Sequence, residues 1–376
     1  MKKIVLLIAL FIVFCDILVA FDILEFSITF IDPARNNREI ETEIFYPGEY
    51  TEKNAIDGEF PVIVFGHGWL MNYTNYNAVT QNFVPNGWIV AFPRTEEGLF
   101  PDHYSFALDL AFVAKSLQLL NHDSTSILYG LVSSVSIVMG HSMGGGCAVL
   151  SASESDIFSA VITLAAAETN PSAISAANEI TIPTITYAAS NDYIAPPATH
   201  QLPIYQNLAS QYKSYVSLIG EGHIGINSNT IVFNSTNPFL DYILSFDLIY
   251  LIEFESVLES YSNAGEITYE IENQLFSTDD PAFQKVVNLD IFPHPSTGQV
   301  VMHYSVVKHT HVRIDIFDIR GRKVRMLIDL EKEPGYFSSI WNGLDDSGNE
   351  VHSGMFFVQL RSDGITCDNK MIYFYK

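Results

Sequence analysis

Three residues in the middle of the chain have the types and the spacing of a nucleophile with its base and its acid. Ser142 lies in Gly-His-Ser-Met-Gly-Gly-Gly (140–146), between the apolar run 135–139 and a run of small residues that can begin a helix. A sharp turn from strand to helix forces such a serine into strained backbone angles, and the glycines let neighbouring backbone pass close by. The pattern therefore predicts that Ser142 is a nucleophile whose hydroxyl projects free of the sheet.

A serine hydroxyl needs a base to take its proton, and the base needs a carboxylate to orient it. Asp192 follows the apolar run 182–189, and His223 follows the run 215–219 on a loop that glycines flank. The order Ser, Asp, His leaves room for a helix and a strand at each step, as this type of site requires. We therefore predict a triad of Ser142, His223 and Asp192, and Asp109 would serve as the acid only if Asp192 failed.

A negative charge develops on the carbonyl oxygen during such a reaction, and backbone N–H groups can stabilise it. The apolar run 61–65 ends in Gly66-His67-Gly68-Trp69, a loop that can supply one donor, and the residue after the nucleophile supplies the other. We predict that Trp69 and Met143 form this oxyanion hole, with Leu70 in place of Trp69 if the loop is displaced by one residue. His67 and His141 are predicted to shape loops.

The rest of the N-terminal part has the pattern of a sheet covered by helices. Two alternating runs, 24–31 and 39–46, predict an antiparallel edge, and from residue 61 strands and helices alternate, which is typical of a mostly parallel sheet. Helices are predicted near 103–120, 142–152, 198–210 and 237–262.

Residues 24–260 resemble the bacterial cutinases and polyester (PET) hydrolases, a group of α/β-hydrolases related to the dienelactone hydrolases. The resemblance rests on the Gly-His-Ser-Met-Gly-Gly-Gly turn and on further motifs in the same order, at 32–38, 182–184, 191–196 and 200–205. It implies an α/β-hydrolase fold with helices on both faces of a mostly parallel sheet. Metal-ligand spacing is absent, and we expect neither a metal nor a cofactor.

Two departures from that group bear on the substrate. Polyester hydrolases usually place Pro-Trp after the strand that follows the nucleophile, whereas this chain has Asn170-Pro171-Ser172, so that Ser172 would widen one wall of the cleft. Trp69 stands where that group more often has a smaller aromatic residue. We predict substrate contacts at Trp69, Tyr73, Ser172 and Ile194.

The 376 residues suit one large domain and one small domain, preceded by a targeting segment. Residues 1–20 begin with Lys2-Lys3 and continue as an apolar run to Ala20, which predicts a cleaved secretory signal peptide. The alternative is an uncleaved membrane anchor, but Asp16 interrupts the run, which is shorter than the ~20 residues of a full span. We expect no stable membrane span in the mature chain.

The composition predicts a catalytic domain over 21–263, a polar and acidic linker over 264–286, and a C-terminal domain over 287–376. Short strands alternate with turns in this last part, as in a small all-β sandwich of the immunoglobulin type. It resembles the sorting domains of type IX secretion cargo and the related flagellar-hook-cap modules, through 292–298, 318–324, 341–348 and 353–357. The resemblance implies the type IX machinery as a partner and a secreted or cell-surface protein. The alternative is a passive spacer or binding module.

The formal net charge of −24 disfavours nucleic acids, anionic membranes and strongly anionic substrates. Cys15 would leave with the signal peptide, Cys147 is expected to be a small buried residue, and we expect no bridge between Cys147 and Cys367.

Together these features predict a secreted serine esterase that cleaves uncharged carboxylic esters through an acyl-enzyme, from short acyl esters to aliphatic or aromatic polyesters. Two alternatives stay open. One is a lactone, dienelactone or lipid esterase of the same fold, and the other is a non-catalytic surface protein with a vestigial hydrolase domain.

Overall fold

The computed structural model describes residues 21–48, 58–274, 289–292, 296–297, 300–306, 309–332 and 335–375. The predicted signal peptide, residues 1–20, lies outside the described residues, as do residues 275–286 of the predicted linker.

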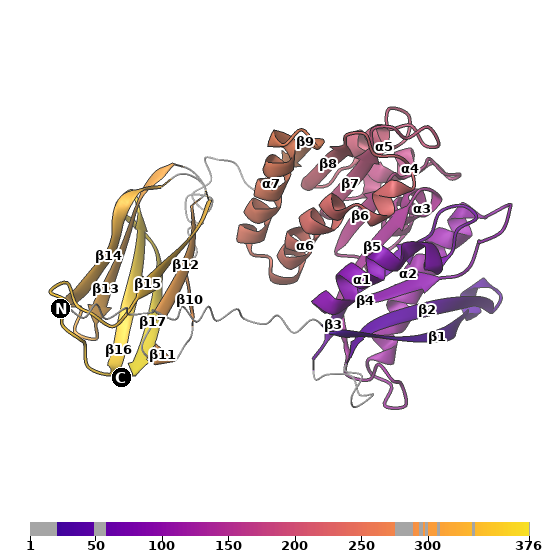
Figure 1. Ribbon diagram of the computed structural model, residues 1–376. Coiled ribbons are helices and arrows are strands. Elements are labelled where there is room, and N and C mark those ends of the chain that lie inside the picture. Colours follow the sequence, from indigo (N-terminus) through magenta and orange to yellow (C-terminus); the bar gives the residue numbers. More distant parts are fainter. Residues whose placement is uncertain are drawn as a thin grey trace, which may run out of the picture.

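The N-terminal part is built on a nine-stranded sheet with the order β1-β2-β4-β3-β5-β6-β7-β8-β9 (Figure 1). The strands from β4 through β3 to β8 are parallel neighbours, while β1, β2 and β9 pair antiparallel. Their bounds are β1 Asp22–Asp32, β2 Arg38–Gly48, β3 Phe60–Gly66, β4 Ile89–Pro93, β5 Val132–His141, β6 Ala160–Leu164, β7 Thr184–Ala189, β8 Tyr212–Leu218 and β9 Ile267–Asn273. This is the predicted α/β-hydrolase class of fold, with the antiparallel edge at β1 and β2.

Helices cover both faces of this sheet. Along β3, Val62 and Val64 join one buried cluster while Ile63 and Phe65 join the other, because successive side chains of a strand point to opposite faces. The first cluster lies under α2, α3 and α5, and the second lies under α1, α6 and α7. The helices are α1 Asn77–Phe83, α2 His103–Leu120, α3 Met143–Glu154, α4 Ala173–Ala176, α5 Gln201–Asn207, α6 Thr230–Ser245 and α7 Leu248–Asn263.

Two predicted boundaries differ from the structure. The single helix predicted over 237–262 is two helices, α6 and α7, because Phe246 adopts a left-handed conformation with φ of 54° and ends α6. The predicted linker over 264–286 was wrong in its first part, since Ile267–Asn273 forms β9 and pairs with β8 along its whole length. Apolar residues alternate with polar or acidic ones in β9, as expected for an edge strand with one buried face.

The C-terminal part is an all-β sandwich, as the sequence predicts. One sheet has the order β10-β12-β15 and the other has the order β11-β17-β16-β13-β14. Side chains from both sheets, including Met302 of β12, Trp341 of β15 and Val358 of β16, form one buried cluster. The strands are β10 Leu289–Phe292, β11 Ser296–Thr297, β12 Val300–Val306, β13 Thr310–Asp318, β14 Lys323–Lys332, β15 Gly335–Trp341, β16 Gly354–Ser362 and β17 Ile365–Tyr375.

Cys147 is a free, fully buried residue of α3, and burial raises the pKa of its thiol. Within the part of the chain that the structure describes, the helices are too short or too polar to cross a membrane. The same residues contain no group of three or more His, Cys, Asp or Glu side chains that could hold a metal ion.

Candidate active site

Ser142 lies at the turn between β5 and α3, with φ of 55° and ψ of −121°. A residue with a side chain adopts a positive φ at a cost of about 1–3 kcal/mol, so the surrounding structure must hold it there. The Ser142 amide donates to the carbonyl of Leu164 (2.9 Å), and the Ser142 carbonyl accepts from Ala167 (2.8 Å) and Gly146 (3.1 Å). The strained conformation predicted for the nucleophile is therefore present and is held from both sides.

The glycines around Ser142 allow α3 to begin very close to two strands. A Cβ atom on Gly144 would collide with the carbonyl groups of Gly66 and His67, and one on Gly140 would collide with the carbonyl of Gly144. Because these obstacles are backbone atoms, they cannot swing aside as a flexible side chain would. The glycines thus bring the Ser142 turn directly against the loop that follows β3.

The structure joins Ser142, His223 and Asp192 through two hydrogen bonds. His223 Nε2 lies 2.8 Å from Ser142 Oγ, and His223 Nδ1 lies 2.6 Å from Asp192 Oδ2. A carboxylate only accepts hydrogen bonds, so Nδ1 carries the proton and Nε2 is left to accept from the serine hydroxyl. All three side chains are buried. In this arrangement the imidazole can take the serine proton.

The Asp192 carboxylate is fixed by its own loop. Its Oδ1 atom accepts from the backbone amides of Ile194 (2.8 Å) and Ala195 (2.9 Å), which leaves Oδ2 for His223. The Asn191 amide donates to the carbonyl of Glu221 (2.8 Å), so the loop of the acid is tied to the loop of the histidine. These bonds orient the carboxylate towards the imidazole before any substrate binds.

The predicted oxyanion loop is a tight turn. The Met71 amide donates to the Gly68 carbonyl (3.0 Å), and Leu70 has a positive φ of 58°. The hydrogen bond of the turn does not use the amide of Trp69. His67 is buried, and its ring nitrogens lie 2.9 Å from the Gly68 carbonyl and 2.8 Å from the Thr95 carbonyl. His67 therefore shapes this loop, as predicted.

Two buried side chains support the site in ways that the sequence analysis did not predict. The ring of Tyr76 is fully buried, and its hydroxyl oxygen accepts from the Gly68 amide (2.8 Å). Gln201 is also fully buried, and its amide group donates to the carbonyls of Ala166 (2.5 Å) and Ala195 (3.0 Å). A polar residue at the start of an apolar helix was the one available signal for Gln201.

The four predicted substrate contacts lie in different settings. Trp69 and Ile194 are 54% and 69% exposed on loops beside the predicted triad. The Ser172 hydroxyl caps α4 by accepting from the Ser175 amide (3.1 Å). This cap gives Ser172 a structural role that requires no contact with a substrate. The Tyr73 ring packs beside Phe45 and beneath the Arg94 guanidinium.

Asp109, the reserve acid, is engaged elsewhere. Its fully buried carboxylate pairs with Arg38 (2.6 Å) and Arg35 (2.7 Å). It also accepts from the hydroxyl of Thr95 (2.6 Å). Asp109 thus anchors the segment after β1 to α2, and Asp192 is the carboxylate beside the imidazole.

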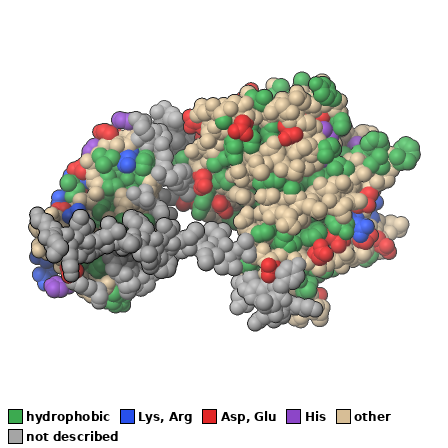
Figure 2. Space-filling model, viewed as in Figure 1, with side chains coloured by type: hydrophobic (Ala, Val, Ile, Leu, Met, Phe, Trp, Pro, Cys, Tyr) green, Lys and Arg blue, Asp and Glu red, His purple; other side chains and the backbone are tan. Residues whose placement is uncertain are grey.

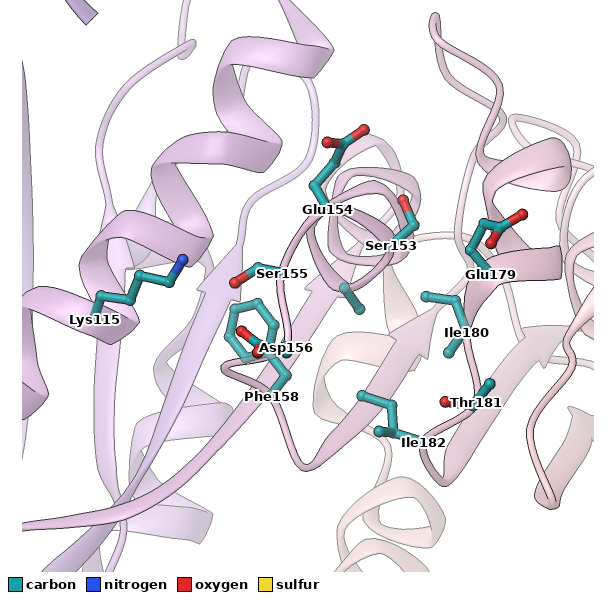
Figure 3. A pocket seen from close by; sticks show the side chains of 11 residues that line it. Lys115, Ser153, Glu154, Ser155, Asp156, Phe158, Glu179, Ile180, Thr181 and Ile182 are labelled. Carbon is teal, nitrogen blue, oxygen red and sulfur yellow. The ribbon is translucent and has the colours of Figure 1, made fainter. Parts of the chain in front are cut away.

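A recess of about 440 Å³ lies elsewhere on the same part of the molecule (Figure 3). Its lining includes Lys115, Glu154, Asp156 and Ile180, and Glu154 is the last residue of α3. Ser142 stands at the other end of that helix, whose 12 residues span about 18 Å. The recess is therefore separate from the predicted triad.

Comparison with known proteins gives both parts of the chain a family. Residues 41–241 match the PET hydrolase-like family model, and residues 290–373 match the model of the secretion system C-terminal sorting domain. Among curated proteins, "Cutinase 2" of Thermobifida cellulosilytica is 34% identical over 186 residues, which are 49% of this chain and 65% of that protein. "Cutinase cut1" of Thermobifida fusca is 34% identical over 186 residues, or 49% of this chain and 54% of that protein.

"Cutinase 1" of Thermobifida cellulosilytica is 37% identical over a shorter stretch of 110 residues, which are 29% of this chain and 40% of that protein. The chain thus spans less than two thirds of the length of these relatives. The resemblance to cutinases and PET hydrolases, and that to secretion sorting domains, are both confirmed. The protein is secreted or held at the cell surface, and its chain belongs to the PET hydrolase-like family.

Proposed function

We propose that this protein is a serine esterase that hydrolyses carboxylic esters, polyesters among them, through an acyl-enzyme. The observation that carries the proposal is the chain of two hydrogen bonds from Ser142 through His223 to Asp192. The membership in the PET hydrolase-like family supports it, since relatives at 34% identity are named cutinases.

In the proposed reaction, Ser142 Oγ attacks the ester carbonyl while His223 Nε2 takes its proton. Asp192 stabilises the imidazolium that forms. The backbone N–H groups of Trp69 and Met143 bind the oxyanion, each contributing about 3–4 kcal/mol to lowering the barrier. His223 then gives the proton to the departing alcohol, and a water molecule, activated by the same imidazole, releases the acid.

The surroundings of the triad support uncharged, apolar esters as the substrate. Trp69, Ile194 and Ile224 are exposed apolar residues on loops next to the three side chains. Lactones, dienelactones and lipid esters belong to the same chemistry. A panel of nitrophenyl esters, lactones, phospholipids and polyester film separates these classes by relative kcat/KM.

The two domains have separate roles in the proposal. The catalytic domain starts after a signal peptide that ends near Ala20, and it includes β9 up to Asn273. The C-terminal sandwich is the part that the type IX secretion machinery takes as its signal. Its core is made of its own side chains, which supports a separately folded unit.

The proposal is tested by replacing Ser142 with alanine. Turnover of a soluble nitrophenyl ester should fall by about 10⁴-fold, and a fluorophosphonate should no longer label the protein. Ser151→Ala is the matched control, because Ser151 lies on the same helix with a buried hydroxyl that has no hydrogen-bond partner among the described residues. That variant should keep full activity.

Activity of Ser142→Ala within tenfold of the unmodified protein would exclude Ser142 as the nucleophile. Failure of the unmodified protein to react with the fluorophosphonate would instead favour a non-catalytic surface protein with a vestigial hydrolase domain.

A further inference from the structure

Glu221 begins the loop that carries His223, and its carboxylate is bound at both oxygens. Acidic side chains are common in this chain, with 43 Asp and Glu residues against 19 Lys and Arg, and Figure 2 shows several of them open to solvent on the α/β part. Glu221 is instead half-buried. Its Oε1 atom accepts from the Gly222 amide (2.9 Å), and its Oε2 atom accepts from the side-chain amide of Asn229 (2.6 Å). The carboxylate therefore joins the two ends of the loop 221–229.

Asn229 is fixed in turn by the helix that it begins. Its side-chain oxygen caps α6 by accepting from the Ile231 amide (2.9 Å), which leaves its N–H group for Glu221. The helix has a buried face that includes Val232 and Phe233. Because the oxygen of Asn229 is already engaged, the side-chain amide cannot turn round and present that oxygen to the carboxylate. The direction of this hydrogen bond is therefore fixed, from the amide to the carboxylate.

The backbone around Glu221 is held by the loop of the proposed acid. The carbonyl of Glu221 accepts from the Asn191 amide (2.8 Å). One residue earlier, the Gly220 amide donates to the Ser190 hydroxyl (2.8 Å), and the Gly220 carbonyl accepts from the Asn191 side chain (3.2 Å). The main chain of Glu221 is thus bound to the acid loop, while its side chain binds the histidine loop to α6.

A glycine leaves room for this carboxylate. A Cβ atom on Gly225 would collide with Oε1 of Glu221. The φ of Gly225 is not positive, so the backbone itself does not require a glycine there. The space taken up by the carboxylate accounts for the glycine, and the loop is therefore packed around the side chain of Glu221.

The position of the imidazole governs the proposed reaction. His223 Nε2 must stay 2.8 Å from Ser142 Oγ, and Nδ1 must stay 2.6 Å from Asp192, when the serine proton moves. A displacement of about 1 Å can lower a rate about a hundredfold. A loop whose ends are free samples many positions, whereas a carboxylate makes stronger hydrogen bonds than a neutral acceptor and can hold the ends together.

We propose that Glu221 is a positioning residue: with Asn229 it clips the loop of His223 to the start of α6. This clip keeps the imidazole between Ser142 and Asp192. The inference rests on the proposed esterase function and adds to it a residue outside the predicted triad. The carboxylate takes part in neither hydrogen bond of the triad, so it acts through the geometry of the loop. Its loss should therefore lower kcat and leave KM nearly unchanged.

The test reverses the direction of one hydrogen bond. Gln has one acceptor oxygen where Glu has two, so in Glu221→Gln one of the two N–H donors, at Gly222 or Asn229, faces another donor. In Asn229→Asp, two carboxylates face each other. The double variant of Glu221→Gln with Asn229→Asp places a donor at position 221 and an acceptor at position 229. It keeps the net charge, and Asp also caps a helix, so α6 keeps its first hydrogen bond.

The matched control makes the same exchange in a second pair. Glu59 accepts from the side-chain amide of Asn121 (3.5 Å), whose oxygen accepts from the Val132 amide (2.9 Å). This pair lies before β3 and β5, at the opposite edge of the sheet from Ser142. Each single and double variant is assayed for kcat and KM on nitrophenyl butyrate over a range of pH, and thermal unfolding checks that it is folded.

We expect kcat to fall about tenfold or more in Glu221→Gln and in Asn229→Asp, with KM within about threefold of the unmodified protein. The double variant should recover kcat to within about threefold, and the control variants should keep it. A double variant as slow as the single variants would overturn the clip, as would full kcat in Glu221→Gln. A pH profile that shifts while its maximum stays undiminished would also overturn it, because Glu221 would then act by its charge.

A further variant displaces the carboxylate without removing it. Gly225→Ala places a Cβ atom where Glu221 Oε1 lies, so it should lower kcat on its own. In a Glu221→Ala background that obstacle is gone, and Gly225→Ala should cause no further loss. Equal losses in the two backgrounds would show that Gly225 acts independently of the carboxylate and would contradict the clip.

A measurement without turnover separates this inference from the proposed function. The Nδ1 proton of His223, hydrogen-bonded to Asp192, should give an NMR signal in the unmodified protein and in the double variant. Exchange with water should remove that signal from both single variants. If the signals follow this pattern but the unmodified protein fails to cleave nitrophenyl butyrate, the esterase proposal is wrong and the clip stands. If the ester is cleaved and the signal is equally strong in every variant, only the clip is wrong.

Discussion

The Nε2 atom of His141 lies 2.9 Å from the backbone oxygen of His223, so the residue before the nucleophile holds the loop of the proposed base. A carbonyl only accepts, hence Nε2 carries the proton of the ring. His141 Nδ1 then accepts from the Tyr76 hydroxyl (3.0 Å), and the Tyr76 oxygen accepts from the Gly68 amide (2.8 Å). One buried chain of hydrogen bonds thus joins the proposed oxyanion loop to the loop that carries His223.

We expect this chain of hydrogen bonds to affect kcat rather than substrate binding. Tyr76→Phe keeps the buried ring but leaves the Gly68 N–H without its acceptor and His141 without its donor, so kcat should fall at least tenfold while KM changes little. Tyr187→Phe is the matched control, because it deletes a buried hydroxyl that bonds to Ser235 (2.7 Å), away from the triad. Both variants should lose about 1–3 kcal/mol of unfolding free energy. Equal kcat in the two variants would refute the role of the chain.

Two substitutions of His141 separate its two hydrogen bonds. Gln can keep a donor at the ε position towards the His223 carbonyl, whereas Asn can keep an acceptor at the δ position towards the Tyr76 hydroxyl. Because the bond to His223 positions the proposed base directly, His141→Gln should react faster with a fluorophosphonate than His141→Asn. The reverse order would show that the bond to Tyr76 dominates.

The same histidine should make stability depend on pH. Burial, with the neighbouring His223, lowers the pKa of His141 to about 3, whereas an imidazole in an unfolded chain has a pKa of about 6.5. Between these values the unfolded state binds more protons, so this contribution to stability is complete above pH 6.5 and is lost as the pH falls. The slope is up to about 1.4 kcal/mol per pH unit.

Urea unfolding at several values between pH 4 and pH 7 measures this effect. In this pH range the unfolded state binds up to about one more proton at His141 than the folded state does. His141→Gln should remove this contribution, so the unfolding free energy should depend less steeply on pH. Tyr76, Asp192 and the other neighbours of the ring are common to both proteins. An unchanged slope would contradict the neutral, buried state of His141.

The glycines near the site should differ sharply in their tolerance of alanine. Gly144→Ala would push a Cβ into the carbonyl groups of Gly66 and His67, so we expect a loss of about 3 kcal/mol or more, or no folded protein. Gly222, next to His223, has nothing within 4 Å of its Cβ position and no positive φ, so Gly222→Ala should be at least as stable as the unmodified protein. Thermal unfolding of both variants measures this difference. A Gly144→Ala variant that unfolds at the same temperature as the unmodified protein would contradict the prediction.

Two truncations test where the catalytic domain ends. A chain of residues 21–280 keeps β9 and should retain esterase activity and thermal stability, because the sandwich has a core of its own. A chain of residues 21–263 lacks β9, so the edge of β8 is exposed and the buried side chain of Ile267 is lost. This chain should therefore unfold at a lower temperature and aggregate. Equal stability of the two chains would show that the catalytic domain ends at residue 263, as the sequence predicted.

The sequence alone predicted the parts of this protein that depend on neighbours along the chain. The glycines around Ser142 predict the strained turn, and the order of Ser142, Asp192 and His223 at the ends of successive apolar runs predicts that they meet. Strands that alternate with helices likewise predict the sheet, and short strands that alternate with turns predict the sandwich. Each of these signals lies within one element or within the regular step from one strand to the next.

Only the tertiary structure decided which residues hold the site in place. Tyr76 and His141 meet across 65 positions, and Arg38 and Asp109 meet across 71, so no local pattern marks these pairs. The break at Phe246 and the pairing of β9 with β8 likewise depend on what the chain packs against. Local composition sets the preference for helix, strand or turn, whereas a buried polar group takes its partner from whichever segment the fold brings within reach, because leaving it unpaired costs free energy.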